Sequence, residues 1–396
     1  MFGFWAQNYV FLFEVKNKST IFAPSMEKVF HIVSHFDVGG AERVAVNIAD
    51  DHEGIVEYHL VEVVRAHSSF TKVFINELRQ KGIRYHRAFV PEVHFHYLFE
   101  RIAALTFPLW FIFLFLRHRP TVIHSHTEVP DMAVRTFFAL FPMFKARCRV
   151  VRTIHSSRLW TGMKSTGRWV ERFFRNSHAN VAISASVRDS YLKEYGQCPP
   201  IIYNGVAVSG RKSFDGLKAG RVNVLFAGRF EREKGVSHVV EIVRAMQHDD
   251  RYHFHIVGAG TLQPLVDEVS HCANVSVYPP LFGLSAYLSS FDYLLMPSEF
   301  EGLSMLSIEA SMSGLPVIAN DCPGLVDTLP AGWPLMVRGN DHGQYIHLFT
   351  HVIPAGSRQE LSATAAAFAN HEFGVKKMQE AYKSLYLHGS EARAVY

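Results

Sequence analysis

Two series of short apolar runs, separated by a stretch of turn residues, constrain this chain more than any other feature. In each series the runs alternate with helix-length segments, a rhythm that predicts βαβ units and hence a parallel sheet with helices on both faces. The strands that we expect in the first series are 29–34, 55–64, 121–124, 150–154 and 180–183. Those in the second series are 222–228, 253–257, 275–277, 293–296 and 316–319. The sequence therefore predicts an α/β fold with two doubly wound parallel sheets.

The domain boundaries follow from the same rhythm, since a chain of 396 residues is too long for one hydrophobic core. We divide it into an N-terminal extension at 1–26, a first domain at 27–200, a linker at 201–220, a second domain at 221–371 and a C-terminal helix at 372–396 that packs back toward the first domain. Residues 1–25 lack the basic segment and cleavage site of a signal peptide. They are either an extension outside the fold or lie upstream of a translation start at Met26.

Cysteine spacing and composition exclude several classes of protein. The four cysteines form no CxxC pair, which argues against a zinc ribbon or a disulfide framework and favours a reducing, cytoplasmic compartment. With 48% hydrophobic and 19% charged residues, the chain can bury sizeable cores and is not a disordered tail.

Positive charge is concentrated in the first half of the chain. Residues 1–200 hold 25 basic and 17 acidic residues, and residues 135–175 hold ten basic residues against one acid, Glu171. Tryptophan and phenylalanine stand among the basic residues, a pattern that suits membrane lipid or nucleic acid. We favour the membrane, because no nucleic-acid-binding module accompanies the pattern. The residues that we assign to a membrane surface are Arg147, Arg149, Arg168, Arg172 and Arg175.

The most apolar stretch, 102–116, lies just upstream of the basic residues. Its fifteen residues include Pro108 and fall short of the roughly 20 that span a bilayer. It is either a buried or half-buried helix of the first domain, or a helix that rests in the membrane interface.

The strongest chemical pattern follows the expected strand 293–296. Glu301 stands at the start of a helix and Glu309 lies inside it, while the amides of Gly302–Ser304 form an anion site at the helix N-terminus. Two carboxylates that flank such a site can accept hydrogen bonds from hydroxyl groups on both sides of a phosphate. A nucleotide sugar has this layout. By itself, a solvated pair of glutamates explains the spacing equally well.

Three further patterns follow other expected strands. Arg229 leaves a strand end and Lys234 precedes a helix, so both could neutralise a diphosphate leaving group. Gly39 and Gly40 follow the first strand and let the backbone approach a ligand. His155 ends a strand and would point into the cleft between the domains. Each pattern also has an ordinary explanation when it is taken in isolation. The segment from Arg229 to Lys234 could be a charged surface loop, the two glycines a tight turn, and His155 one incidental histidine among 23.

Taken in this order, the patterns resemble family 4 glycosyltransferases of the GT-B fold. The matching segments are Gly39-Gly40-Ala41-Glu42, Thr153-Ile154-His155, Tyr203-Asn204-Gly205-Val206, Gly228-Arg229 with Lys234-Gly235, Glu301 with Glu309, and residues 312–319. The resemblance spans about residues 29–340. It implies two Rossmann-like domains that face each other across a cleft, with the acceptor bound by 27–200 and the nucleotide sugar by 221–371.

The resemblance also implies a role for each matched residue. Arg229 and Lys234 would bind the donor diphosphate, and Glu309 would hold the ribose hydroxyls. Glu301 would hold the donor sugar, and His155 would touch it near the reacting carbon. The implied donor-binding set is Gly39, Gly40, Gly228, Arg229, Lys234, Glu301, Gly302, Leu303, Ser304, Met305 and Glu309, with Glu301, His155, Arg229 and Lys234 as the catalytic residues.

The sequence gives no convincing metal site. His124 with His126, and His94 with His96, could each offer two ligands, but neither pair has a third in the pattern. The family resemblance implies no metal, so we expect no cofactor beside the nucleotide sugar as co-substrate. At Ser304 the chain departs from the family, where a glycine often stands.

We therefore predict a retaining glycosyltransferase that moves a hexose from a nucleotide diphosphate sugar, with uridine as the expected base, to a lipid-linked or membrane-bound saccharide. Assembly of bacterial surface polysaccharide or lipopolysaccharide, on the inner face of the cytoplasmic membrane, is the expected setting. The alternatives are another sugar-nucleotide enzyme of this fold, such as an epimerase or a phosphorylase, and a membrane-associated scaffold with a degenerate site.

Overall fold

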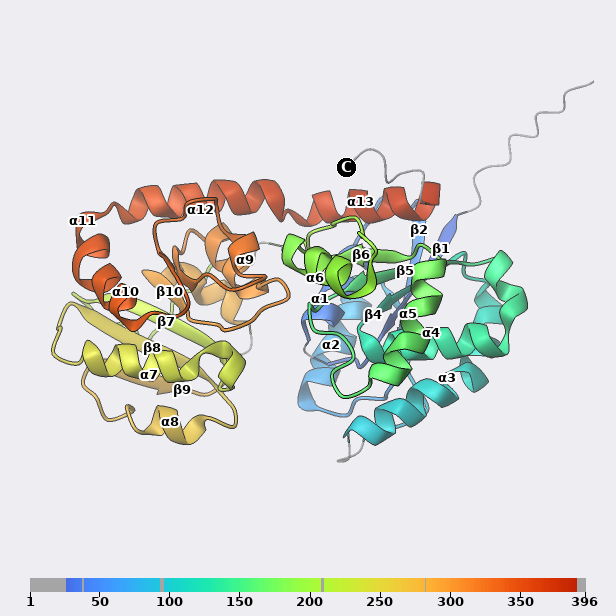
Figure 1. The fold of residues 1–396 in the computed structure, drawn as a ribbon, viewed down its shortest axis with the longest axis horizontal. Helices are drawn as coiled ribbons and strands as arrows, with labels where there is room; N and C mark the ends of the chain where they lie inside the picture. Colours follow the sequence, from blue (N-terminus) through green and yellow to red (C-terminus); the bar gives the residue numbers. More distant parts are fainter. Residues whose placement is uncertain (1–25, 38, 93–95, 208–209, 282, 390–396) are drawn as a thin grey trace, which may run out of the picture.

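The computed structural model describes residues 26–37, 39–92, 96–207, 210–281 and 283–389, and these contain two six-stranded parallel sheets (Figure 1). The first sheet is built from β1 (Glu27–Val33), β2 (Val56–Glu62), β3 (Arg84–His86), β4 (Val122–His126), β5 (Arg149–Ile154) and β6 (Asn180–Ala182). The second is built from β7 (Val222–Arg229), β8 (Tyr252–Ala259), β9 (Val275–Tyr278), β10 (Tyr293–Met296), β11 (Val317–Asn320) and β12 (Met336–Val337). The structure confirms the predicted α/β class with two doubly wound sheets.

Helices connect successive strands in both halves. The first half contains α1 (Gly40–Ala49), α2 (Ser69–Gln80), α3 (His96–His118), α4 (Glu128–Leu140), α5 (Lys164–Asn176) and α6 (Ala185–Tyr195). The second half contains α7 (Val236–Ala245), α8 (Gln263–Asp267), α9 (Met305–Met312), α10 (His342–His347), α11 (Ile353–Ala355), α12 (Arg358–Glu372) and α13 (Val375–His388). Short 3-10 segments lie at Pro142–Ala146, Arg232–Lys234, Leu284–Ser290 and Val326–Thr328, and a π-helical segment at Leu348–Val352.

The expected strands lie within two residues of the observed ones at each end. The sequence pattern missed β3 and β12, the outer strands on one edge of each sheet. They are only three and two residues long, and Arg84–His86 is mostly polar, so neither presents an apolar run.

The strand order fixes where a ligand can bind. The first sheet runs β3-β2-β1-β4-β5-β6 and the second runs β12-β11-β10-β7-β8-β9. In each sheet the winding therefore reverses beside the first strand, between β1 and β4 and between β7 and β10. Open parallel sheets bind ligands at the carboxyl ends of the strands at such a reversal. The loops that follow β1, β4, β7 and β10 are thus the places to look for a site.

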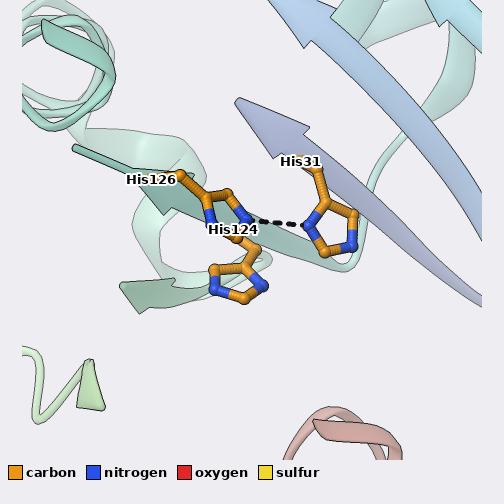
Figure 2. Close-up of side chains that lie close together, drawn as sticks. All are labelled: His31, His124 and His126. Atoms are coloured by element: carbon orange, nitrogen blue, oxygen red, sulfur yellow. Dashed lines mark hydrogen bonds between the residues drawn. The ribbon is translucent and has the colours of Figure 1, made fainter. Parts of the chain in front are cut away.

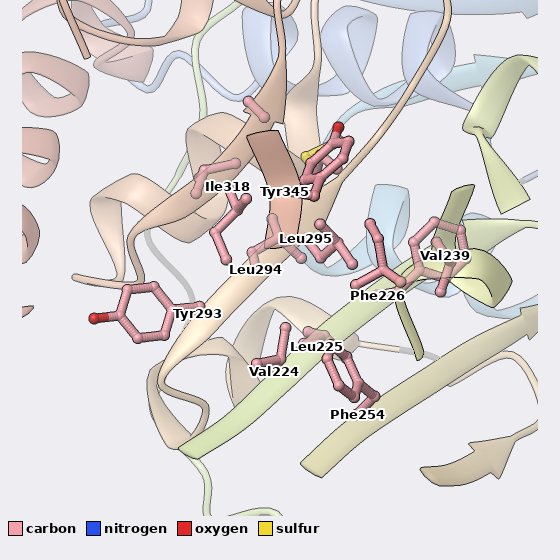
Figure 3. Close-up of a cluster of buried hydrophobic side chains, with 14 of the residues drawn as sticks. Val224, Leu225, Phe226, Val239, Phe254, Tyr293, Leu294, Leu295, Ile318 and Tyr345 are labelled. Carbon is pink, nitrogen blue, oxygen red and sulfur yellow. The ribbon is translucent and has the colours of Figure 1, made fainter. Parts of the chain in front are cut away.

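Apolar side chains fill both faces of the second sheet. Figure 3 shows residues of β7, β8, β10 and β11 meeting Val239 of α7 and Tyr345 of α10. Neighbours in sequence such as Leu294 and Leu295 are both fully buried, as expected for strands of a parallel sheet that is covered on both sides.

The C-terminal end of the chain crosses back to the first domain. α12 packs on α9, and α13 packs on α1 and β1 (Figure 1). Nε2 of Gln379 donates hydrogen bonds to the carbonyl oxygens of Asn47 at 2.7 Å and Asp50 at 3.1 Å. Tyr382 and Tyr386 are fully buried against the first sheet. The last helix therefore covers one face of that sheet.

α3 is half buried and longer than the apolar stretch from which it was expected, with 23 residues. One face packs into the core against α4, with Phe107, Phe111 and Phe115 buried. The opposite face carries exposed apolar side chains at Ile102, Leu105, Leu109, Phe113 and Leu116. The segment Phe99–His118 is long and apolar enough to cross a membrane by length and composition, a test that core helices also pass.

Candidate active site

The loop between β7 and α7 is held against the end of β10. Gly235 has a φ of +70°, and a Cβ atom there would lie 1.8 Å from the carbonyl oxygen of Pro297. Only glycine fits this backbone and this close approach. The packing brings Lys234, at the end of the loop, beside the segment that follows β10.

Lys234 and Glu301 meet at this place. Nζ of Lys234 lies 2.7 Å from Oε1 and 2.9 Å from Oε2 of Glu301. The Ser298 hydroxyl donates a third hydrogen bond to Oε1 at 2.9 Å. The side chains of Lys234 and Glu301 are 25% and 10% exposed, so solvent screens the pair only partly. The two residues were predicted on separate motifs, and the structure brings them together; the sequence pattern gave Ser298 no role.

Arg229 lies at the surface, unlike Lys234. Its side chain is 71% exposed, and Nη2 donates to Oε1 of Glu233 at 2.9 Å. A phosphate group at Arg229 would have to compete with this carboxylate.

The segment 301–304 forms a loop before α9 rather than the first turn of the helix. The amide of Glu301 donates to the carbonyl oxygen of Pro323 at 3.2 Å, and the amide of Ser304 donates to that of Gly324 at 3.1 Å. The Ser304 hydroxyl caps α9 and accepts from the amide of Ser307 at 3.4 Å. The expectation that the Ser304 amide points at an anion is therefore wrong, because a carbonyl group already binds it.

Gly302 lies where the two domains touch. A Cβ atom on Gly302 would lie 2.2 Å from the carbonyl oxygen of His155, so a side chain would push the domains apart. The carbonyl oxygen of Gly302 accepts a hydrogen bond from the Ser184 hydroxyl at 2.9 Å. Leu303 is buried in a cluster with Ile154 and Ile183 of the first domain. The loop that follows β10 is thus docked on the carboxyl ends of β5 and β6.

Glu309 of α9 is half-buried and lies close to a charge from the first domain. Burial raises its pKa to about 7, while the charge of Arg43 on α1 opposes the shift. The carboxyl group therefore titrates near neutral pH. Among the predicted donor residues, Met305 begins α9 and packs partly buried against both domains, and Gly228 lies near the end of β7.

The pair Gly39-Gly40 begins α1, with Gly39 as the N-cap. A Cβ atom on Gly39 would lie 2.1 Å from Oε2 of Glu42, so the carboxyl group of Glu42 fills the space that the glycine leaves. Backbone amides of Ser34 and His35 donate to this carboxyl group, and its burial raises its pKa to about 7. Glu42 belongs to the motif Gly39-Gly40-Ala41-Glu42, but only the structure shows that its carboxyl group stabilises the loop between β1 and α1.

His155 follows β5, and its carbonyl oxygen lies beside Gly302 at the domain boundary. That its side chain points into the cleft stays a prediction. Nε2 of His155 lies 3.1 Å from Nδ1 of His126 on β4. Burial lowers the pKa of His155 to about 3, so the ring is neutral at physiological pH.

A group of histidines lies close to His155, and the sequence pattern identified only two of its members. His124 and His126 on β4 point to one face of the sheet, as expected, and the structure adds His31 of β1 as a third member (Figure 2). His31 and His124 pair in register on adjacent strands, so the strand order, rather than any spacing along the chain, brings them together. Of the other predicted pair, His94 lies outside the described residues.

The predicted membrane residues lie away from this site. Arg147 and Arg149 line a hollow of about 700 Å³, and Arg172 and Arg175 line another of about 620 Å³. Both hollows border the amino ends of strands β4–β6, whereas His126 and His155 lie at the carboxyl ends. Arg149 also donates to Glu27 at 3.1 Å. Arg168 is exposed on α5.

Comparisons with known proteins match both halves of the chain. Residues 38–209 match the family described as Glycosyltransferase Family 4, and residues 221–353 match the family described as Glycosyl transferases group 1.

Three individual proteins illustrate how similar the chain is to its relatives in sequence and in fold. An uncharacterized 41.2 kDa protein in the cps region of Klebsiella pneumoniae is 24% identical, over 67% of this chain and 78% of that protein. The capsular polysaccharide biosynthesis glycosyltransferase CapH of Staphylococcus aureus is 24% identical, over 75% of this chain and 82% of that protein. Among solved structures, Anabaena Alr3699/HepE in complex with UDP and glucose superimposes with a TM-score of 0.72 at 16% identity, covering 93% of this chain and 100% of that one.

Proposed function

Since the chain is a glycosyltransferase of the GT-B type, with a family 4 domain followed by a group 1 domain, we propose that it transfers a hexose from a nucleotide diphosphate sugar to a saccharide acceptor in polysaccharide biosynthesis. The observation that carries the proposal is the shielded contact of Lys234 with Glu301, directly beside Gly302 and His155 at the domain boundary. A cation and a carboxylate placed together can bind a phosphate and a sugar hydroxyl of one ligand.

In this proposal the donor binds mainly to the second domain. Lys234 turns from Glu301 to the diphosphate, Arg229 leaves Glu233 to join it, and Glu301 then accepts hydrogen bonds from the sugar. Glu309 holds the ribose. We propose uridine as the base; support comes from Anabaena HepE, whose structure in complex with UDP and glucose has the same fold.

The chemical step that we propose retains the anomeric configuration. Positive charge from Lys234 and Arg229 stabilises the leaving diphosphate, and an oxygen of that diphosphate takes the proton of the acceptor hydroxyl. His155 is unsuited to act as the base, because its pKa lies near 3 and leaves it a weak base at neutral pH. We propose that these two cations supply the charge that a metal ion would otherwise provide, so that transfer needs no metal.

We propose further that the acceptor is lipid-linked or otherwise membrane-associated, and that the protein works peripherally on the inner face of the cytoplasmic membrane. Support comes from the exposed apolar face of α3, where Leu109 and Phe113 are 65% and 71% exposed. Phe107, Phe111 and Phe115 of the same helix are buried in the domain core, which favours a helix lying in the interface over one that spans the bilayer. Arg168 on α5 is an exposed cation available to anionic lipid.

A transfer assay tests the proposal. Purified protein is incubated with UDP-, GDP- and ADP-sugars and a membrane lipid extract, with and without EDTA, and products are detected by mass spectrometry. We expect a hexose-sized mass gain on a lipid-soluble acceptor with a UDP-sugar, unchanged by EDTA. Release of nucleotide with no glycosylated product from any extract would contradict it and favour an epimerase or a hydrolase.

Matched variants connect this activity to the site. Arg229→Ala is compared with Arg244→Ala, since Arg244 is also an exposed arginine of the second domain and pairs with Glu268. We expect the first substitution to reduce kcat/KM by about 10²-fold and the second to leave it unchanged. Equal effects would remove Arg229 from the mechanism.

A further inference from the structure

Three histidines, two on neighbouring strands and one directly after the next strand, form a hydrogen-bonded chain that ends at the domain boundary. Nδ1 of His31 lies 3.0 Å from Nε2 of His126, the contact drawn in Figure 2. Nδ1 of His126 lies 3.1 Å from Nε2 of His155. Both separations are typical of a single hydrogen bond between two nitrogen atoms. The chain therefore runs from the interior of the first sheet to His155.

The sheet topology explains the direction of this chain. β1, β4 and β5 are neighbours, His31 pairs in register with His124, and His126 pairs with Thr153. His126 thus lies two residues beyond His31 toward the carboxyl edge, and His155 lies two residues beyond Thr153. Each step moves closer to the edge at which the second domain docks.

All three rings are neutral. Burial lowers the pKa of His31 and of His155 to about 3 and lowers that of His126 well below its usual value. Protonation of His126 would also be opposed by any positive charge on its neighbours His124, His31 and His155, which lowers its pKa further. A neutral imidazole carries one N–H and one bare nitrogen, so each ring can donate at one nitrogen only.

Two arrangements of protons satisfy both hydrogen bonds. If donation runs from His31 to His155, all three rings carry the proton on Nδ1, and Nε2 of His31 is a bare acceptor. If donation runs the other way, all three carry it on Nε2, and His31 holds a buried N–H. Among the described residues, Nε2 of His31 has no hydrogen-bond partner. A buried N–H without an acceptor is rarer in proteins than an under-used acceptor, which favours the first arrangement.

We propose that His31 and His126 are positioning residues that hold His155 in the tautomer with its proton on Nδ1. Because His126 occupies Nε2, Nδ1 is the ring nitrogen left for a ligand, and it offers a hydrogen-bond donor. A donor suits a hydroxyl oxygen of the transferred sugar. This last step rests on the proposed function, whereas the tautomer itself does not.

A metal ion is the competing explanation for the histidine group. The ligand atoms of His31, His124 and His126 all lie within 4.8 Å of one another. However, His124 uses Nδ1 to bind the Tyr386 hydroxyl at 2.6 Å and Nε2 to bind the Thr153 hydroxyl at 2.7 Å. Five of the six ring nitrogens are therefore already engaged in hydrogen bonds within the protein, which favours the hydrogen-bonded chain.

Nitrogen NMR of the full-length protein tests the tautomer without any substrate. The protein is labelled with ¹⁵N-histidine, and the signals of His155 are identified from their loss in His155→Gln. We expect a protonated Nδ1 and a bare Nε2 in His155 and in His126, unchanged from pH 6 to pH 8. A protonated Nε2 in His155, or a stoichiometric metal found by elemental analysis of the purified protein, would overturn the proposal.

A pair of substitutions at His126 tests the consequence for transfer. In His126→Asn the side-chain amide replaces Nδ1 and still donates to His155, whereas His126→Phe keeps the ring and removes the donor. We expect kcat/KM to fall about 10-fold in His126→Phe and to stay within about 3-fold of wild type in His126→Asn. His253→Phe, which replaces a buried histidine of the second domain, serves as the control for folding.

The NMR measurement and the activities of the variants distinguish the proposed transferase function from the proposed positioning role of His31 and His126. An Nδ1 tautomer in a protein that transfers no sugar would refute the proposed function alone. Active protein with equal losses in His126→Asn and His126→Phe would refute the positioning role, because the conservative amide would then rescue nothing.

Discussion

Replacing Lys234 by methionine perturbs the central pair of the site and should affect stability and catalysis separately. Methionine keeps the apolar part of the side chain but removes the ammonium group. That group donates two hydrogen bonds to the Glu301 carboxylate, at 2.7 and 2.9 Å. The Glu301 side chain is only 10% exposed, so its carboxylate would be left with the Ser298 hydroxyl as its side-chain partner.

The size of the stability loss follows from this geometry. A hydrogen bond to a charged group contributes about 1.5–3 kcal/mol, and breaking a fully buried ion pair costs about 3–5 kcal/mol. Because Lys234 is 25% exposed, the loss should be smaller than for a fully buried ion pair. We expect a decrease of about 2–3 kcal/mol in the free energy of unfolding. Urea denaturation followed by circular dichroism measures it.

The double variant Lys234→Met/Glu301→Gln distinguishes stability from catalysis. Removing the stranded charge should restore most of the lost stability, since neither partner is then left charged and unpaired. It should not restore transfer, and we expect kcat/KM to remain about 10²–10³-fold below wild type in both variants. Recovery of activity together with stability, or wild-type turnover in Lys234→Met, would refute the role of Lys234 at the leaving diphosphate.

Three further predictions follow from other residues. Burial raises the pKa of Glu309 to about 7, above its value in the unfolded chain, so the native state retains a proton that the unfolded state releases. The free energy of unfolding should therefore fall as the pH rises from about 4.5 to 7. In urea denaturation, Glu309→Gln should reduce the difference in this free energy between pH 5 and pH 8 by about 1–3 kcal/mol. Gly302→Ala places a methyl group against the carbonyl oxygen of His155 and should lower kcat/KM by about 10-fold or more, whereas Gly210→Ala, which meets nothing within 4 Å, should behave as wild type; equal activities would show that domain contact at Gly302 is unimportant. Leu109→Asn/Phe113→Asn removes two exposed apolar side chains of α3 and should weaken binding to anionic liposomes by about 10-fold or more in flotation assays; unchanged flotation would exclude α3 from the interface.

The fold and the second-domain loops could be predicted from the sequence because local pattern determines them. Apolar runs set the strands to within two residues, and Arg229, Lys234 and Glu301 follow strand ends that the pattern had already located. The predicted anion site at Gly302–Ser304 failed in part because a segment distant in sequence supplies an acceptor for one of its amides. Ser304 caps α9 with its hydroxyl, and its amide binds the carbonyl oxygen of Gly324, a partner twenty residues away.

Contacts between distant segments could not be predicted. The pairing of Lys234 with Glu301 depends on the approach of Gly235 to Pro297, and His31 joins His126 only because β1 and β4 are neighbours in the sheet. The assignment of basic residues to a membrane surface stays a prediction. These residues lie on α5 and at the amino ends of the strands, around two hollows that share His178, and this placement depends on the sheet topology rather than on charge density along the chain.

A crystal structure of the protein with UDP would locate the diphosphate and so test the proposed donor site. We expect a diphosphate oxygen within hydrogen-bonding distance of Nζ of Lys234 and the ribose hydroxyls on the carboxyl group of Glu309. We also expect that Glu301 has lost its contact with Lys234 and faces the space beside His155. A diphosphate bound elsewhere, with the contact between Lys234 and Glu301 unchanged, would contradict the proposed site.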